Sequence, residues 1–257
     1  LKPRETYRVE MYLTDYYCIN APMLLAHDVL WRSTGTFVSD KNGIIDISQT
    51  PSCSGSYEGI STMGLFFNAK PLTKKKLPSS LSKIPLLDQF FVKIKIMQGN
   101  TVIAERTFSR RYMSSQISHQ DIYGEHFQGR LFYDKKSLKA PALIIVSGSE
   151  GRIEKAQNMA QLLSSRGYIC LAVAYFGLEG LPKHLERIPL ECLVGAKDYL
   201  RQHPQVDSES IGIYGRSKGA EFVLAEESLF NDVQCLVLNS PSDVAVSYTH
   251  LRAHETR

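Results

Sequence analysis

The alternation of apolar and polar positions divides the chain into two regions. Up to about residue 135, short apolar stretches alternate with turn residues, and they predict strands over residues 7–12, 35–38, 44–47, 63–68, 90–97 and 101–108. Turn-forming residues stand between them at 40–43 and 98–100, the second typical of a hairpin. We therefore expect an all-β immunoglobulin-like sandwich over residues 1–135.

After residue 135 the pattern changes to strands that alternate with helices. Residues 142–146 form a continuous apolar run, typical of a parallel strand covered on both faces. Further strands are predicted at 168–174, 211–214 and 233–238, and helices at 156–163, after Pro189 and after Ser217. This alternation predicts a parallel sheet with flanking helices over residues 136–246.

Composition changes this picture little. The formal net charge of +4 is mild for 257 residues, and no stretch is basic enough to require nucleic acid or a membrane surface as a partner. Apolar runs all fall short of the roughly 18 to 20 residues that span a bilayer. The lysines at 74–76 fit a solvated loop better than a phosphate contact. The sequence does not reveal the oligomeric state.

The five cysteines lack any metal-binding spacing. Their odd number and scattered, apolar surroundings favour reduced, buried thiols, and we expect no metal and no cofactor. The expected location is intracellular and cytoplasmic. Organellar targeting stays open, because both termini are expected to be incomplete.

The pentapeptide at residues 215–219 is the most informative chemical signal. It reads Gly-Arg-Ser-Lys-Gly between a predicted strand and a predicted helix, the context of a nucleophile elbow. Glycines on both sides permit the tight turn that exposes the hydroxyl of Ser217. In this context a catalytic serine is a stronger prediction than a structural turn. Because serine is a poor nucleophile by itself, it also needs a base that takes its proton.

Such a serine needs donors for the oxyanion of its tetrahedral intermediate. We expect one from the backbone N–H of Lys218 and another from the loop that follows residues 142–146, with Gly148 or Ser149 as the donor. Glu150 and Glu154 are interpreted as charges at a helix N-terminus. An ordinary strand-to-helix connection is the alternative for each loop residue.

The histidine and the acid that complete such a site are harder to place. Five histidines precede the serine, whereas the chain order of this fold is serine, acid, histidine. Asp243, His250 and His254 follow it but leave no room for intervening strands. Residues 247–257 resemble a translated sequencing adapter, so we expect native sequence to end near 246, in a truncated α/β-hydrolase domain without its acid and histidine.

Both regions also resemble one family, that of acyl-CoA thioesterases and bile acid-CoA:amino acid N-acyltransferases. In the amino-terminal region the resemblance lies in residues 31–38, 43–46, 55–59 and 63–66. In the carboxyl-terminal region it lies in residues 166–168, 174–177, 181–183, 188–191 and 215–221. The loop at 147–151 is poorer in glycine than is usual in that family.

The resemblance implies an enzyme that acts on acyl-CoA thioesters, with CoA as part of the substrate. Serine at position 217 resembles the hydrolases of the family, whereas its amino-acid-conjugating members include some with cysteine there. Three alternatives stay open: an N-acyltransferase, an esterase of dienelactone-hydrolase type, and a binding protein with a degenerate hydrolase half. The fragment itself is expected to be inactive.

Overall fold

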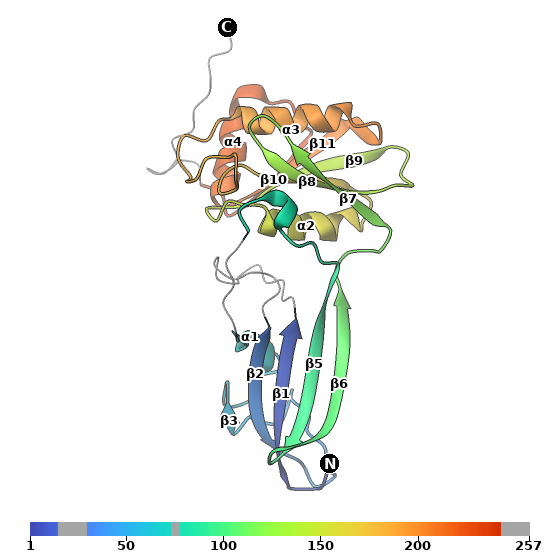
Figure 1. Ribbon diagram of the computed structural model, residues 1–257, viewed down its shortest axis with the longest axis vertical. Coiled ribbons are helices and arrows are strands. Elements are labelled where there is room, and N and C mark those ends of the chain that lie inside the picture. Colours follow the sequence, from blue (N-terminus) through green and yellow to red (C-terminus); the bar gives the residue numbers. More distant parts are fainter. Residues whose placement is uncertain (15–29, 73–77, 243–257) are drawn as a thin grey trace. The chain divides into compact units, whose positions relative to one another are not determined.

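The computed structural model describes residues 1–14, 30–72 and 78–242, which fall into two compact units. The first unit comprises the chain up to Leu77 together with Gln89–Arg111. The second comprises Pro78–Asp88 and the chain from Tyr112 onward. Each unit has its own sheet and its own apolar core (Figure 1).

The first unit is built on one antiparallel sheet. Its strand order is β3-β2-β1-β5-β6, and β4 also pairs with β2. Buried side chains from alternating positions of β1, including Val9, Met11 and Leu13, pack with Phe37 and the short helix α1. The strands are β1 (Thr6–Thr14), β2 (Trp31–Val38), β3 (Ser54–Gly55), β4 (Lys70–Pro71), β5 (Gln89–Gln98) and β6 (Thr101–Arg111).

This sheet confirms the predicted strands at 7–12, 35–38, 90–97 and 101–108 and the hairpin turn after Gln98. The described residues show a single sheet here, so the two facing sheets of an immunoglobulin-like sandwich are not confirmed. Two predicted strands are wrong. The segment 63–68 contains α1 (Gly64–Phe67), because a short apolar run fits a buried helix as well as a strand.

The segment 44–47 is a loop rather than a strand, for a local reason. The Asp40 carboxylate accepts the backbone N–H groups of Asn42 and Ile44 at 2.8 and 2.7 Å. Asp46 accepts that of Ser48 at 2.9 Å. Such side-chain acceptors compete with strand pairing for the backbone donors, and the sequence pattern alone did not weigh them.

The second unit holds a six-stranded mixed sheet of order β12-β11-β9-β10-β8-β7. The four strands β12, β11, β9 and β10 are parallel, as predicted, and β8 and β7 add antiparallel pairs. Their bounds are β7 (Ile117–Tyr123), β8 (Gln128–Asp134), β9 (Ala140–Val146), β10 (Ile169–Ala174), β11 (Val206–Arg216) and β12 (Cys235–Asn239).

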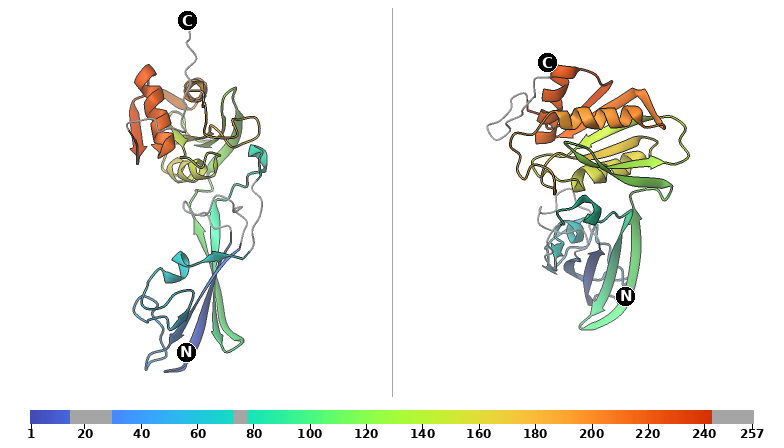
Figure 2. Two further views of the ribbon diagram at one scale, coloured as in Figure 1. Left: turned by 90° about the vertical axis from the view of Figure 1, so that its left-hand side faces the viewer. Right: turned by 45° about the horizontal axis from the view of Figure 1, so that its top comes forward.

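Within the described part of the chain, three helices cover the two faces of this sheet. The helix α2 (Glu154–Ser164) packs against one face through Ala156 and Ala160. The helices α3 (Glu191–Gln202) and α4 (Lys218–Phe230) pack against the other. Figure 2 shows α2 and α3 on opposite sides of the strands. Because β10 is buried at every residue, it confirms the continuous apolar pattern expected of a central parallel strand.

The division between the units differs from the boundary expected at residue 135. Both β7 and β8 pair into the second sheet, and Leu131 and Phe132 of β8 are fully buried there. The segment Pro78–Asp88 also belongs to this unit, since Arg130 donates to the carbonyls of Ile84 and Leu81 at 3.3 and 3.1 Å. A linear reading of strand-like runs cannot show which sheet a strand joins.

The free cysteines correct another expectation. Cys170 and Cys192 are buried as predicted, and burial raises the pKa of both thiols. Cys53 and Cys235 are exposed, so the expectation of burial is wrong for them; Cys18 lies outside the described residues. Among the helices described, none is long and apolar enough to cross a bilayer.

Candidate active site

Ser217 occupies the turn between β11 and α4, as the sequence predicts. Its backbone angles are φ 53° and ψ −123°, a conformation that residues with a side chain rarely adopt. Its hydroxyl makes no capping bond to the helix that follows. A strained backbone that presents a hydroxyl without a structural role is typical of a nucleophile elbow.

Close packing explains the two glycines of the pentapeptide. A Cβ atom on Gly219 would lie 2.0 Å from the carbonyl oxygen of Ser147. A Cβ atom on Gly215 would lie 2.8 Å from the Cα atom of Ala220. Both contacts are with backbone, which moves far less readily than the end of a side chain. The strand, the helix and the loop after β9 therefore approach one another only because these positions lack side chains.

The loop after β9 lies directly against the serine. A Cβ atom on Gly148 would lie 3.1 Å from the Cβ atom of Ser217. Ser147 and Gly148 are buried, whereas Ser149 is exposed. The two segments that the sequence singled out, far apart along the chain, are thus neighbours at the carboxyl edge of the parallel strands.

Tyr175 holds this loop through its hydroxyl, a contribution that the sequence analysis missed. Its hydroxyl donates to the carbonyl oxygens of Ser147 and Gly148, at 3.1 and 2.9 Å. Its ring is fully buried and stacks on Phe222 of α4 with centroids 5.0 Å apart. Burial, with help from the nearby Glu150 carboxylate, raises the pKa of Tyr175, so it stays a donor. A tyrosine directly after a buried strand was the available signal.

The backbone N–H groups around Ser217 divide into engaged and unengaged ones. Ser217 donates its N–H to Asn239 of β12 at 2.8 Å, and the N–H of Gly151 bonds to Gly148 at 3.0 Å. Within the described ranges, no hydrogen bond engages the N–H groups of Gly148 and Ser149. Lys218 opens α4, so its backbone lies at the positive end of the helix dipole.

Charged side chains close to the serine are paired. The Lys218 ammonium is buried and bonds both carboxylate oxygens of Glu221, at 2.8 and 2.7 Å. Glu150 accepts from Arg216 at 3.1 Å and faces Lys155 at 3.3 Å. Glu150 therefore bridges the loop and the elbow rather than marking a helix N-terminus, whereas Glu154, in the first turn of α2, fits that interpretation.

No described histidine is hydrogen-bonded to Ser217. His119 lies on β7, at the opposite edge of the sheet from β12, and His203 follows α3 and contacts the ring of Tyr133. His126 lies between β7 and β8, and His184 lies in the loop before α3. His27, Asp243, His250 and His254 lie outside the described residues.

Three further expectations concern the lysine cluster, a metal site and a cofactor. The lysines at 74–76 fall outside the described residues. In the part of the chain that the structure describes, no group of three His, Cys, Asp and Glu side chains is arranged to hold a metal ion. The absence of a cofactor stays a prediction.

Two family models match the chain. Residues 1–123 match the acyl-CoA thioester hydrolase/BAAT N-terminal region, and residues 188–256 match the BAAT/acyl-CoA thioester hydrolase C terminal. The second match includes most of the segment 247–257, which lies outside the described residues and whose origin stays a prediction.

Curated relatives carry the names of thioesterases and acyltransferases. Acyl-coenzyme A thioesterase 1 of Mus musculus is 27% identical over 88% of this chain and 54% of its own length. Acyl-coenzyme A thioesterase 2, mitochondrial, of Rattus norvegicus is 27% identical over 88% and 50%. Acyl-coenzyme A amino acid N-acyltransferase 2 of Mus musculus is 28% identical over 89% and 56%. The chain thus spans about half the length of these relatives.

Solved structures show only a distant likeness. A dienelactone hydrolase-like promiscuous phosphotriesterase, P91, is 14% identical with a TM-score of 0.43, and the match covers 54% of this chain and 67% of P91.

Proposed function

The chain belongs to the acyl-CoA thioester hydrolase/BAAT family, and from this premise we propose that it serves the hydrolysis of acyl-CoA thioesters with Ser217 as the nucleophile. The observation that supports this role most is the backbone of Ser217, at φ 53° and ψ −123°, beside the loop at Gly148. A fold maintains such strain where a reacting group must be held in place.

In the proposed reaction, the Ser217 hydroxyl attacks the thioester carbonyl carbon while a base takes its proton. The tetrahedral intermediate then expels the CoA sulfur, which leaves as a thiol after receiving that proton. The acyl group stays on Ser217 as an oxygen ester. In the second step water attacks the acyl carbon, the bond between that carbon and the Ser217 oxygen breaks, and the oxygen takes back a proton as the fatty acid is released.

Backbone donors are proposed to stabilise the intermediate. The N–H of Lys218 lies at the positive end of α4, and the N–H of Gly148 or Ser149 belongs to the adjoining loop. The Tyr175 bonds hold the carbonyls of this loop, so the loop donors need little reorganisation during the reaction. Loss of one such donor typically costs about 10²–10³ in turnover.

The base and its acid partner are proposed to lie outside the described residues. Because no described histidine bonds to Ser217, we expect little turnover from residues 1–242 taken by themselves. The turnover expected of the whole protein therefore depends on a histidine that this structure does not describe.

Substitution of the nucleophile tests the proposal. In the whole protein, Ser217→Ala is expected to lower acyl-CoA turnover by about four orders of magnitude without loss of folding, since the hydroxyl caps no helix. Turnover is followed by the free thiol of released CoA, and folding by circular dichroism. Near-normal turnover would remove Ser217 from the mechanism, and absence of any turnover in the unsubstituted whole protein would favour a binding role.

A transferase is the second candidate, because relatives of similar identity are named amino acid N-acyltransferases. Serine at 217 favours water as the acceptor, as its resemblance to the hydrolases of the family implies. Adding glycine or taurine to the assay distinguishes the two: conjugated amide would indicate transfer, and free fatty acid hydrolysis. Simple esters in place of acyl-CoA test the esterase alternative.

We also propose that the protein acts inside the cell, because its four described cysteines are all free. Fractionation of cells that express a tagged form would test this location.

A further inference from the structure

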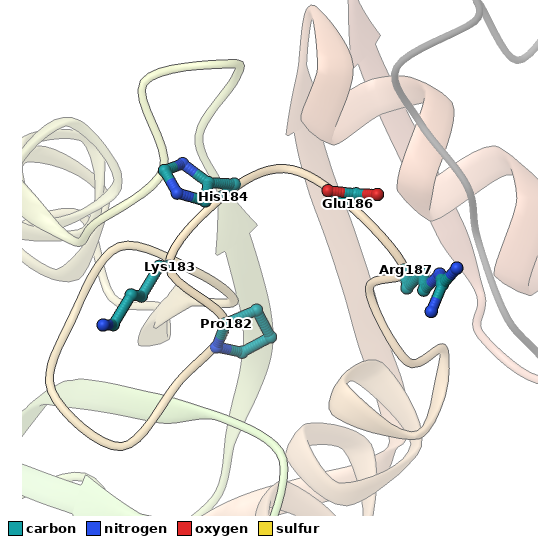
Figure 3. Close-up of a pocket in the computed structure, with 5 residues that line it drawn as sticks. All are labelled: Pro182, Lys183, His184, Glu186 and Arg187. Atoms are coloured by element: carbon teal, nitrogen blue, oxygen red, sulfur yellow. The ribbon is translucent and has the colours of Figure 1, made fainter.

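A pocket lies in the loop between β10 and α3, apart from Ser217. Its volume is about 250 Å³, and Pro182, Lys183, His184, Glu186 and Arg187 line it. Figure 3 shows Pro182 and Lys183 on one arm of the loop, Glu186 and Arg187 on the other, and His184 at the bend. The pocket is smaller than the roughly 300–1,000 Å³ of a site for a whole drug-sized ligand, and suits a charged fragment of one.

We propose that this pocket binds the phosphate groups of the CoA part of the substrate, an inference that rests on the proposed function. Coenzyme A carries a diphosphate and a ribose phosphate. Lys183 and Arg187 supply cationic donors, and His184 can add a donor. Arginine matches the geometry of phosphate oxygens in a paired fashion, and lysine acts as a point charge.

The topology places the pocket on the side of the sheet where substrate must arrive. β9, β10 and β11 are parallel, so the loops after them lie at the same edge, the one that carries Ser217. The pocket loop follows β10 and is tied to the loop after β9, because Arg152 donates to the carbonyl of Gly177 at 3.3 Å. Ligands of open α/β sheets bind outside the carboxyl ends of the strands.

The pocket loop is anchored rather than loosely attached. Leu178 and Ile188, on either side of the lining residues, are buried in the core. Gly177 donates its N–H to the carbonyl of Pro182 at 2.8 Å. Gln128 of β8 also donates to the carbonyl of Glu179 at 2.6 Å. These contacts fix the two arms of the loop that carry the lining residues.

One of the cationic residues that line the pocket also has a strained backbone. Arg187 has φ 54°, in the left-handed region that favours glycine. Strained residues of this kind cluster at ligand clamps and active sites. Glu186 is the acid in the lining, and its charge opposes an anion in the same space.

Because the charge of Glu186 opposes an anion, removing it should have the opposite effect to removing a cation. Titration calorimetry measures the binding of CoA to the protein and its variants, without any need for turnover. Lys183→Ala and Arg187→Ala are each expected to weaken CoA binding about fivefold to tenfold, whereas Glu186→Gln is expected to tighten it. A purely structural role of the loop would not produce effects of opposite sign.

Two comparisons complete the design. Lys139 lies just before β9, at the other edge of the sheet, so Lys139→Ala removes one charge away from the pocket and should leave CoA binding unchanged. Pantetheine, which lacks the phosphates, should bind all variants alike. Dephospho-CoA, if it binds as CoA does, assigns the pocket to the diphosphate; if it binds more weakly, to the ribose phosphate.

The outcome separates the pocket from the catalytic proposal. Equal CoA binding by all variants, or an equal loss with Lys139→Ala, would overturn the phosphate site whatever the protein hydrolyses. Charge-dependent CoA binding without thioester hydrolysis by the whole protein would support the pocket and refute the proposed function instead.

Discussion

The two ends of α4 differ in the state of their polar side chains. At its amino end, Ser217 keeps a strained backbone and a hydroxyl that caps nothing. Toward its carboxyl end, Glu226 and Glu227 are buried and face the ammonium of Lys197 from α3, at 2.7 and 3.0 Å. Asp232 and Arg201 extend this group of charges. The strained backbone of Ser217 is typical of a catalytic site. The paired buried charges instead hold α3 and α4 together.

The largest effect on stability is expected at Lys197, which is fully buried. Lys197→Met leaves buried carboxylates without their cation, so the free energy of unfolding should fall by about 3–5 kcal/mol. Denaturant unfolding measures it. Lys139→Met, the same change at an exposed lysine, should stay within about 0.5 kcal/mol. A small loss at Lys197 would show that the cluster does not stabilise the contact between α3 and α4.

The same cluster should make stability depend on pH. Burial, and then the neighbouring Glu227, raise the pKa of Glu226 from its usual 4.5 to about 7, although Lys197 opposes the shift. The folded state therefore binds this proton more tightly than the unfolded state does. The contribution is fully present below pH 4.5 and is lost as the pH rises to about 7.

Comparison with Glu226→Gln isolates that contribution. The free energy of unfolding of the unsubstituted protein, minus that of the variant, should decline between pH 4.5 and 7. Urea unfolding at a series of pH values gives the difference. A difference that grows over this range would mean that the ion pair with Lys197 outweighs burial.

A smaller effect is expected where the site meets the core. Tyr175→Phe keeps the ring that stacks on Phe222 but removes the hydroxyl that donates to the carbonyl of Ser147, and it leaves the carbonyl of Gly148 with only the N–H of Gly151. Unfolding should become easier by about 1–3 kcal/mol, and turnover should fall because the loop is less firmly held. Tyr133→Phe, at a half-buried tyrosine of β8, is the control. Unchanged turnover with lost stability would confine Tyr175 to a structural role.

The smallest effect concerns the strain itself. Ser217→Gly removes the side chain that makes φ 53° unfavourable, whereas Ser217→Ala keeps a Cβ atom there. The glycine variant should therefore be more stable than the alanine variant by about 1 kcal/mol, and neither should retain turnover. Thermal melts compare the two. Equal stability would show that the turn is not strained.

The sequence predicted the second sheet better than the first, and the reasons are physical. β10 is buried at every residue and β9 at most of its residues, and burial of this kind produces the continuous apolar runs from which both strands were predicted. In the first unit, Asp40 diverts the backbone donors of a strand-like segment, and α1 forms from an apolar run of ambiguous period. Such choices depend on competing local bonds rather than on pattern.

The candidate site, too, could be predicted from the sequence only in part. Glycine spacing around Ser217 predicted the elbow, since only a tight turn requires glycine on both sides. The support from Tyr175 and the bridge of Glu150 to Arg216 depend on contacts between distant segments. Periodicity and motif spacing carry no information about such contacts.

Trapping the acyl group tests the central claim most directly. The whole protein is mixed with a slowly hydrolysed acyl-CoA, quenched and digested, and the peptide that contains residues 215–219 is examined by mass spectrometry. The account predicts one acyl group on Ser217, lost in Ser217→Ala. Continued thioester hydrolysis with no acyl group on this peptide, or with the acyl group on another residue, would contradict it.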